Sequence, residues 1–430
     1  MAPQEKDHAY RIFRAALEAA DPEQAVLRHL RIDGDALIAG RRRYRLSRFD
    51  RIHVVGAGKA SASMARAVER TLGRRVSSGV INVPDGRRQP RLKRIELQPS
   101  GHPVPDDRGL KGARRILEIA RRAGEKDLLI CLISGGASAL MPTPAPPVTL
   151  AAEQRVTRQL LKCGATIHEI NTIRKHISFA KGGQLAALAW PATVITLILS
   201  DVIGDDPGVI GSGPTAPDSS TAADAARVFE KYSIRQIPLR ETPKPGDPEF
   251  TRVQNLIVGS NRQAVDAAAR KARALGYRTM VLSTSVEGEA REVALVHAAI
   301  IKEILDRGQP LRAPACVLSG GETTVTVRGK GVGGRNQEFV LAAALALDGL
   351  GPFIVFSAGT DGADGPTDAA GAIADEQTLH RARALMREDL RRFLADNNSY
   401  RFFEKIKGLV KTGPTGTNVM DIRILLVPAK

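Results

Sequence analysis

The chain contains few aromatic residues, few cysteines and no long apolar segment. Aromatic residues make up 4% of its 430 residues, with a single tryptophan, so a hydrophobic core must be built mainly from Ala, Leu, Val and Ile. Its cysteines, Cys131, Cys163 and Cys316, form no C-x-x-C pair, and their odd number argues against a disulfide framework. This cysteine usage is typical of a reducing compartment.

The sequence also shows no segment that would direct it to or across a membrane. No stretch approaches the ~20 apolar residues of a membrane-spanning helix. Residues 1–20 predict an amphipathic helix without an apolar signal-peptide core, and Glu5, Asp7 and Glu18 argue against a transit peptide. We therefore expect a cytoplasmic protein that has no membrane partner.

The chain carries a strong excess of positive charge. Its formal net charge of +17 is compatible with a nucleic-acid partner, with a small anionic substrate or with a general excess of arginine. The basic runs Arg41–Arg51 and Arg87–Arg94 contain little aromatic interleaving and match no nucleic-acid-binding motif. We interpret both runs as solvated surface and expect no nucleic-acid partner.

Short apolar runs alternate with helical patterns, and a chain of this length is expected to form two domains. Strands are predicted at Ile52–Val55, Leu128–Ile133 and Val194–Leu199, with helices at Ser61–Leu72 and from near Ser138. This order indicates βα units and a mostly parallel sheet in an α/β fold.

A proline-rich stretch, Ile237–Asp247, interrupts this pattern, because its prolines forbid regular structure. We place the boundary there, between an N-terminal domain over 1–240 and a C-terminal α/β domain over 250–430. The elements expected beyond it are Asn255–Val258, Arg262–Leu275, Thr279–Ser283, Glu287–Arg307, Cys316–Leu318, Thr323–Val327, Phe353–Phe356 and Ile422–Val427. Two of these, Cys316–Leu318 and Thr323–Val327, are β-rich and separated by a Gly-Gly turn, so a mixed sheet is expected in the C-terminal domain.

A glycine-rich loop with Lys59 follows the first predicted strand. Gly56 and Gly58 would let the backbone approach a ligand, and the helix that follows offers N–H groups to an anion. A Walker A loop would need glycine in place of His53, so that motif is excluded. A dinucleotide fingerprint would need a third glycine in place of Ser61, so the match to NAD-binding loops is partial. Lys59 would add a mobile positive charge to a phosphate-binding loop.

A second loop of the same form follows the next strand. It contains Ser134, Gly135, Gly136 and Ser138 between a strand and a helix. Either serine could donate a hydrogen bond to an anion, although Ser138 is equally suited to cap the helix. We predict that this loop contributes to a phosphate or substrate site.

Two further groups of polar residues complete the predicted N-terminal site. Arg174 and Lys175 lie in a basic cluster with His176, which alone is more typical of a structural histidine. Asp201 ends a strand in a glycine-rich loop, where α/β proteins bind ligands, and could hold Mg²⁺ or orient a substrate hydroxyl. Turn chemistry also favours aspartate at such a position.

The C-terminal domain carries its own candidate loops. Arg335 begins a helix and could clamp a carboxylate or phosphate with two N–H groups. Asp361 follows a strand as a candidate metal ligand or general base, and the bidentate glutamate of a calcium loop is missing. The other candidate binding residues here are Ser319, Gly320, Gly321, Glu322, Asn336 and Asn418.

Several anion-capable loops with a lysine, an arginine and isolated aspartates suit phosphoryl transfer, which needs positioning and charge neutralisation more than covalent chemistry. The sequence contains no Ser-His-Asp set and no zinc-like cluster of His and Cys. The ordered motifs are VVGAGKAS, GHPVPD, LISGGASAL, INTIRKHIS with KGGQLA, LSDVIGDDP with GSGPT, SGGETTV, GGRNQEFVL, AGTDGADGPTDAAGA and TGPTGTNVMD.

In this order and over nearly the whole chain, the motifs resemble the class II glycerate kinase family, with residues from about 316 to 425 similar to its MOFRL domain. The resemblance implies ATP- and Mg²⁺-dependent phosphorylation of D-glycerate, giving 2-phosphoglycerate in bacterial members. It also implies two α/β domains, the first Rossmann-like, with the active site in the cleft between them. Carried over by motif, the catalytic candidates are Lys59, Arg335 and Asp361, with Asp201 and Asp361 as candidate metal ligands.

Two alternatives remain open at this point. The first is an NAD(P)H-dependent hydroxypyruvate reductase, a label this family has carried, which would use the Gly56-x-Gly58 loop for the dinucleotide. The second is a non-catalytic nucleic-acid-binding protein, suggested only by the charge. The sequence leaves open whether the protein is a monomer or a homodimer.

Overall fold

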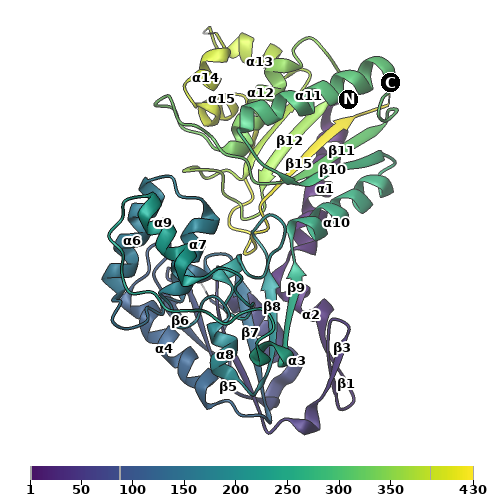
Figure 1. Cartoon of the computed structure of the whole chain (residues 1–430). Helices are drawn as coiled ribbons and strands as arrows, with labels where there is room; N and C mark the ends of the chain where they lie inside the picture. Colours follow the sequence, from purple (N-terminus) through teal and green to yellow (C-terminus); the bar gives the residue numbers. More distant parts are fainter. Residues whose placement is uncertain (1, 87–88, 388, 430) are drawn as a thin grey trace. The chain divides into compact units, whose positions relative to one another are not determined.

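Two six-stranded sheets organise the chain, one in each of two units. The computed structural model describes residues 2–86, 89–387 and 389–429 (Figure 1). The N-terminal unit is Pro22–Val258, and the C-terminal unit combines Met1–Asp21 with Gly259–Lys430. The predicted α/β fold with two domains is confirmed. The division differs from the predicted one, because it falls after Val258 and assigns the first helix to the C-terminal unit.

The sheet of the N-terminal unit has the strand order β6-β5-β4-β7-β8-β9. Neighbouring strands from β6 to β8 run parallel, as the βα pattern predicts. The strands are β4 (Arg51–Ala57), β5 (Val76–Pro84), β6 (Glu96–Ser100), β7 (Asp127–Ser134), β8 (Thr193–Leu199) and β9 (Val253–Gly259). β7 is buried along its whole length, as expected for a central parallel strand covered on both faces.

Helices cover both faces of this sheet. α3 (Ser61–Leu72) packs on one face together with α2 (Pro22–His29), and α4 (Asp107–Arg122) packs on the other with α8 (Gln184–Ala189). The helix predicted near Ser138 is the single turn α5 (Ala137–Leu140). The loops after β4, β7 and β8 therefore lie together at the carboxyl ends of the parallel strands.

Three further helices form a cluster with a core of its own. They are α6 (Leu150–Lys162), α7 (Ile167–His176) and α9 (Ala222–Lys231), each begun by a threonine that accepts a hydrogen bond from the first turn. Ile237 and Leu239 pack against this core. The proline-rich stretch Ile237–Asp247 is thus irregular, as predicted, but it belongs to the N-terminal unit and does not link two domains.

A small antiparallel sheet in the N-terminal unit was not predicted. It consists of β1 (Leu30–Asp33), β2 (Ala36–Ala39) and β3 (Arg42–Arg45). Gly34 and Gly40, both with φ of 60°, make its two-residue turns, and these glycines were the available sequence signal. Part of the basic run Arg41–Arg51 is therefore a strand, while Arg87 and Arg88 of the other run lie outside the described residues.

The sheet of the C-terminal unit is mixed, as predicted, with the order β10-β11-β15-β12-β13-β14. Among the described residues, β10 and β11 pair in parallel, and the other neighbouring strands are antiparallel. The strands are β10 (Arg278–Val286), β11 (Ala315–Gly321), β12 (Ile354–Gly359), β13 (Gly371–Asp375), β14 (Leu409–Val410) and β15 (Asp421–Val427).

The strand predicted at Thr323–Val327 is wrong. Gly320 and Gly321 make no turn, because they lie within β11 and pair with β15. Beyond them Thr324 forms only an isolated bridge with Glu289, whose carboxylate accepts the Thr326 N–H, so side-chain contacts replace a strand ladder there.

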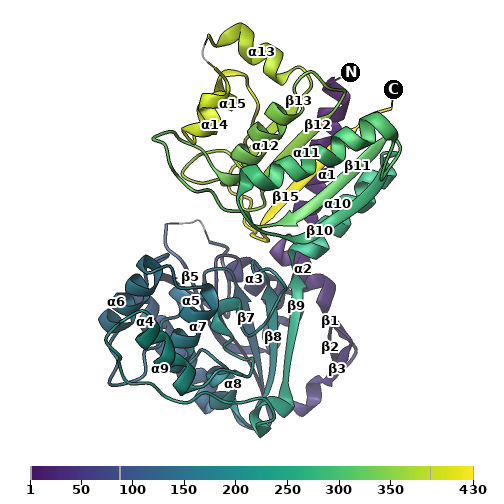
Figure 2. The same cartoon turned by 45° about the horizontal axis from the view of Figure 1, so that its top comes forward.

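Helices also cover both faces of the C-terminal sheet (Figure 2). α1 (Ala2–Ala19) and α10 (Asn261–Ala274) pack on one face, and α11 (Ala290–Arg307) and α12 (Arg335–Ala346) pack on the other. The remaining helices are α13 (Thr378–Leu385), α14 (Arg391–Ala395) and α15 (Ser399–Lys405). None of the described helices is long and apolar enough to cross a membrane.

Candidate active site

The Lys59 loop leaves the end of β4 and is tied to the end of β7. The Lys59 N–H donates to the Gly135 carbonyl (2.9 Å), and the Ala60 N–H donates to the Ser134 hydroxyl (3.0 Å). A Cβ atom at Gly58 would lie 2.1 Å from the Ser134 Oγ, and Gly58 has a φ of 147°. Gly58 therefore serves the close packing of two strand ends, and the predicted approach of a ligand to this glycine is not what requires it.

The same holds for two other predicted residues. A Cβ atom at Gly56 would lie 2.1 Å from the Leu132 carbonyl oxygen. Ser134 is fully buried, and its hydroxyl contacts Ala60 and Ser61. Ser134 thus holds the Lys59 loop in place, and its predicted role as a donor to an anion has no support in the structure.

The Lys59 side chain borders the glycine pair Gly135 and Gly136. A Cβ atom at Gly136 would lie 3.5 Å from the Lys59 Cε and 2.9 Å from the His102 Nε2, and one at Gly135 would lie 2.0 Å from an Asp201 carboxylate oxygen. Lys59 is half-buried, and its ammonium makes no hydrogen bond or ion pair within residues 2–86, 89–387 and 389–429. A half-buried ammonium in this state is available to an anion.

His102 was not predicted as a site residue, although its motif GHPVPD was noted. The loop after β6 brings it to the glycine pair, and this placement depends on strand order, which the local sequence does not contain. Lys59, His102 and Asp201 thus gather at the carboxyl ends of neighbouring strands, where open α/β sheets bind ligands.

A pocket of about 410 Å³ adjoins this group. Its walls come from one face of α6, one face of α7, and the loops after β6, β7 and β8. The lining residues are His102, Pro103, Val104, Pro105, Gly136, Ala137, Ser138, Ala139, Gln154, Thr157, Arg158, Leu161, Ile167, Asn171, Arg174, Val202, Val209 and Gly211. Gly136 lines the pocket and also borders the Lys59 side chain, so the pocket adjoins Lys59.

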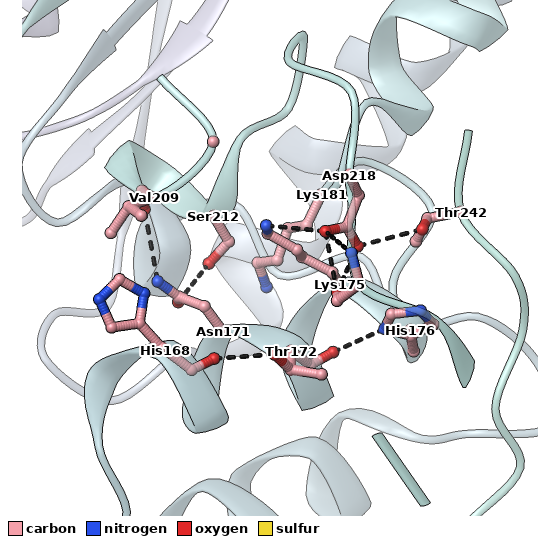
Figure 3. Close-up of polar contacts among 12 residues, drawn as sticks. His168, Asn171, Thr172, Lys175, His176, Lys181, Val209, Ser212, Asp218 and Thr242 are labelled. Carbon is pink, nitrogen blue, oxygen red and sulfur yellow. Dashed lines mark hydrogen bonds and ion pairs between the residues drawn. The ribbon is translucent and has the colours of Figure 1, made fainter. Parts of the chain in front are cut away.

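Arg174 and Lys175, both predicted as binding residues, have different surroundings. Arg174 lines the pocket, and in the part of the chain that the structure describes its guanidinium has no hydrogen-bond or ion-pair partner. Burial lowers the pKa of Arg174. The Lys175 ammonium instead binds the buried Asp218 carboxylate at 3.0 Å (Figure 3). Lys175 is thus committed to the protein, whereas Arg174 can receive a ligand.

The Lys175 contact belongs to a network that stabilises the helical cluster. Asp218 also accepts a hydrogen bond from Thr242 (3.0 Å), and the buried Lys181 ammonium binds the Glu153 carboxylate at 2.8 Å. The His176 Nδ1 lies 2.7 Å from the Thr172 carbonyl, as expected for a structural histidine (Figure 3). This network fixes the pocket walls that α6 and α7 provide.

A chain of hydrogen bonds fixes the direction in which the Ser138 hydroxyl donates its proton. The buried Ser212 hydroxyl donates to the Asn171 side-chain oxygen (2.9 Å, Figure 3) and lies 2.5 Å from the Ser138 oxygen. Because Ser212 has one proton and gives it to Asn171, Ser138 must donate its own proton to Ser212. Ser138 therefore offers the pocket only acceptor lone pairs, contrary to the predicted donation to an anion.

In the C-terminal unit, Arg335 is held by carboxylates of the protein. Its Nε and Nη2 donate to the buried Asp421 carboxylate (2.7 and 3.0 Å), and its Nη1 lies 2.8 Å from Glu322. Burial alone would lower the pKa of Arg335, but the facing charge of Asp421 outweighs burial and raises it. A guanidinium has more N–H groups than these contacts use, so Arg335 keeps part of its donor capacity.

Asn336 and Asp364 support the start of α12. The Asp364 carboxylate accepts the Asn336 and Gln337 N–H groups (3.0 and 2.9 Å), and burial raises the pKa of Asp364 to about 6. The Asn336 amide donates to Asp421 and its oxygen accepts from Ser357. Asn336, a predicted binding residue, is thus buried and engaged with the protein. Asp364 was not predicted, because its partners lie far away in sequence.

Asp361 lies near Arg335's partner Asp421. A Cβ atom at Gly359 would lie 3.3 Å from an Asp361 oxygen and 3.5 Å from an Asp421 oxygen. The Asp361 Oδ1 accepts the Ala363 N–H at 3.0 Å, and the residue is half-buried. Asp361 thus remains a candidate for contact with a substrate.

The other predicted residues of this unit serve the sheet. The buried Ser319 hydroxyl lies 2.9 Å from the His297 Nε2, and the Asn418 oxygen accepts the Met420 N–H. Gly320 and Gly321 pair with β15, and a Cβ atom at Gly320 would lie 1.8 Å from the Asn261 oxygen. Gly320 and Gly321, predicted as binding residues, are therefore engaged in the sheet.

No group of three or more His, Cys, Asp or Glu that could hold a metal occurs among the residues described. Mg²⁺ does not require one, because it is usually held by one or two carboxylates together with substrate phosphates. Asp201, beside Gly135, is suited to this mode in the N-terminal unit, and Asp361 has the same chemistry in the C-terminal unit.

Comparison with known proteins identifies the family. A domain of unknown function (DUF4147) matches residues 8–241, and the MOFRL family matches residues 315–421. The chain is 42% identical to the D-glycerate 2-kinase of Thermotoga maritima over 428 residues, which cover 98% of each chain. It belongs to the class II glycerate kinase family.

The structure agrees with this assignment. It is similar to the crystal structure of glycerate kinase from Thermotoga maritima, with a TM-score of 0.90, 41% sequence identity and 99% of both chains covered. A relative from Agrobacterium vitis, which is named a putative hydroxypyruvate reductase, is 42% identical over 97% of this chain and 93% of its own.

Proposed function

We propose that the protein is an ATP-dependent glycerate 2-kinase, which transfers the γ-phosphoryl group of ATP to D-glycerate. Similarity over 98% of the chain to a D-glycerate 2-kinase supports this activity. The observation that carries it is the Lys59 ammonium, which lies beside Gly136 at the carboxyl ends of the parallel strands and has no partner in the described part of the chain. There it neutralises charge on the phosphate oxygens during transfer.

The residues of the C-terminal unit have proposed roles that follow from their contacts. Asp361 accepts the proton of the attacking hydroxyl, because one of its carboxylate oxygens is not used by the Ala363 N–H. The N–H groups of Arg335 that Asp421 and Glu322 leave unused donate to the glycerate carboxylate. Asp421 fixes the guanidinium plane and thus the direction of these donors.

Mg²⁺ is part of the proposal. Asp201 would hold it in the N-terminal unit together with phosphate oxygens, or Asp361 would do so in the C-terminal unit. When bound, the ion neutralises charge on the phosphate chain. We also propose that the enzyme acts on small molecules in the cytoplasm, without a nucleic-acid partner, as a monomer or a homodimer.

The name of the Agrobacterium vitis relative makes hydroxypyruvate reduction the second candidate function. It would place a dinucleotide on Gly56 and Gly58. Both glycines are packed against β7, with Cβ positions 2.1 Å from its atoms, and they offer no open backbone for a pyrophosphate. This packing favours the kinase.

The decisive experiment compares two substrate pairs. The full-length protein is incubated with D-glycerate and MgATP, and separately with hydroxypyruvate and NADH. We expect consumption of ATP and formation of 2-phosphoglycerate, identified by NMR of the product. Oxidation of NADH without use of ATP would instead establish the reductase.

A further inference from the structure

The pocket beside Lys59 exposes an unusual set of apolar side chains. Val104, Leu161 and Ile167 line it and are 60%, 61% and 52% exposed, although large apolar residues are usually buried. They come from three different segments, the loop after β6, α6 and α7. Apolar side chains that gather in a concave site indicate a ligand with an apolar surface.

The size of the pocket bears on which ligand this is. A three-carbon acid such as glycerate is small and polar on every side, and it would fill only a small part of about 410 Å³. Pockets of this size and lining typically enclose a larger, partly aromatic molecule. The nucleoside of the phosphate donor has such a surface in its base.

The polar groups of the pocket fit the remaining parts of a nucleotide. Arg174 supplies a guanidinium for a phosphate, because it has no hydrogen-bond or ion-pair partner among the residues described. Ser138 accepts but does not donate, because its proton is given to Ser212, and a ribose hydroxyl is a donor. At the inner end, Gly136 borders both the pocket and the Lys59 side chain.

We propose that this pocket is the nucleoside site, with the base packed between Leu161 and Ile167 and a ribose hydroxyl donating to Ser138. The phosphate chain then passes Arg174 and Gly136 and ends at Lys59. This inference rests on the proposed kinase activity. It adds to that proposal the place where the nucleoside of the nucleotide binds. It assigns the apolar faces of α6 and α7 to the nucleotide rather than to the acid.

The test uses binding of ADP to the full-length protein, measured by isothermal titration calorimetry without glycerate. Leu161→Glu and Ile167→Glu place a charge where the base would pack and should each weaken ADP binding by about tenfold or more. Leu385→Glu is the matched control, since Leu385 is 64% exposed and lies in α13 of the other unit. This control should bind ADP like wild type.

Steady-state kinetics separate this inference from the kinase assignment. We expect Leu161→Glu to raise the KM for ATP and leave the KM for glycerate unchanged. Unchanged ADP binding in both pocket variants, or a rise confined to the KM for glycerate, would overturn the nucleoside site while the kinase stands. If wild type binds ADP and the variants do not, yet no glycerate is phosphorylated, the pocket stands and the proposed acceptor is wrong.

The role of Ser138 is tested with deoxynucleotides. Wild type should bind 2′-deoxyADP or 3′-deoxyADP more weakly than ADP, by about three- to tenfold for one lost hydrogen bond. In Ser138→Ala this discrimination should vanish, because the acceptor is gone. Equal discrimination in wild type and Ser138→Ala, or none in wild type, would show that Ser138 does not contact the ribose.

Discussion

Arg174 and Arg335 are both half-buried arginines in candidate sites, but their surroundings are opposite. Arg335 is held between Asp421 and Glu322, so its charge is balanced before any substrate arrives. Arg174 lines a pocket without a partner among the residues that the structure describes. Burial costs Arg174 hydration, and in the free protein only the charge of Glu153 offsets part of that cost, which a bound anion would relieve further. The N-terminal unit is thus organised to receive charge, and the C-terminal unit to hold its groups in fixed directions.

The largest expected effect comes from Lys59. Lys59→Ala should lower kcat by about a thousandfold, because it removes a cation at the phosphate oxygens, and should leave the fold intact. The comparison variant is Lys175→Ala, which removes a cation bound to Asp218 and should act mainly on stability. Activity of Lys59→Ala near the wild-type rate would contradict the assignment.

Arg335→Gln should destabilise the C-terminal unit by about 3 kcal/mol, because the buried Asp421 carboxylate loses both guanidinium hydrogen bonds and keeps, among the described side chains, only the Asn336 amide and Arg423, which lies 3.6 Å away. Trp190, the single tryptophan, lies in the N-terminal unit and reports on that unit alone. We therefore expect a shift in the unfolding transition followed by circular dichroism, with tryptophan fluorescence unaffected. If both signals shift together, the effect is not local to the C-terminal unit.

Arg174→Gln should behave in the opposite way. Because Arg174 donates no hydrogen bond to a carboxylate among the described residues, and nearby Glu153 is already bound by Lys181, the free energy of unfolding should change by less than about 0.5 kcal/mol. The KM for ATP should rise about tenfold, which initial-rate measurements would show. A loss of stability comparable to that of Arg335→Gln would remove the distinction between the two arginines.

The smallest expected effect concerns pH. The folded pKa of Asp364 is about 6, above its ordinary value of 3.8, so the folded state holds this proton more tightly. The resulting stability is fully present below pH 3.8 and is lost as the pH rises through 6. From pH 5 to 7 the C-terminal unit should lose about 1 kcal/mol. Asp364→Asn should abolish that loss in circular-dichroism denaturation, and a persistent loss would assign it to another group.

Much of the fold could be predicted from the sequence, because the hydrophobic periodicity of strands and helices and the residues that favour turns are local features. The strands around Ile52–Val55 and Leu128–Ile133 and the helix Ser61–Leu72 were found within a few residues. The antiparallel sheet of β1 to β3 was missed, although Gly34 and Gly40 marked its two turns. The division of the chain was misplaced because prolines show where regular structure stops and not which core a coil packs against.

The site was predicted less well, for a different physical reason. A motif shows which residues are close in sequence, whereas a site depends on which way each side chain points. Arg174 and Lys175 are neighbours on α7, yet one faces the pocket and the other Asp218. Ser212, 74 residues away in sequence, determines where the Ser138 hydroxyl donates its proton. No local sequence pattern contains this coupling.

The position of α1 in the C-terminal unit affects when this unit can fold during synthesis. Ile12, Phe13 and Ala16 of this first helix are buried in the C-terminal unit, and the Ala20 carbonyl accepts a hydrogen bond from Thr417. During synthesis α1 emerges long before its partners, so its apolar face must wait until most of the chain has been made. An N-terminal truncation should therefore damage the part of the protein that the ribosome makes last.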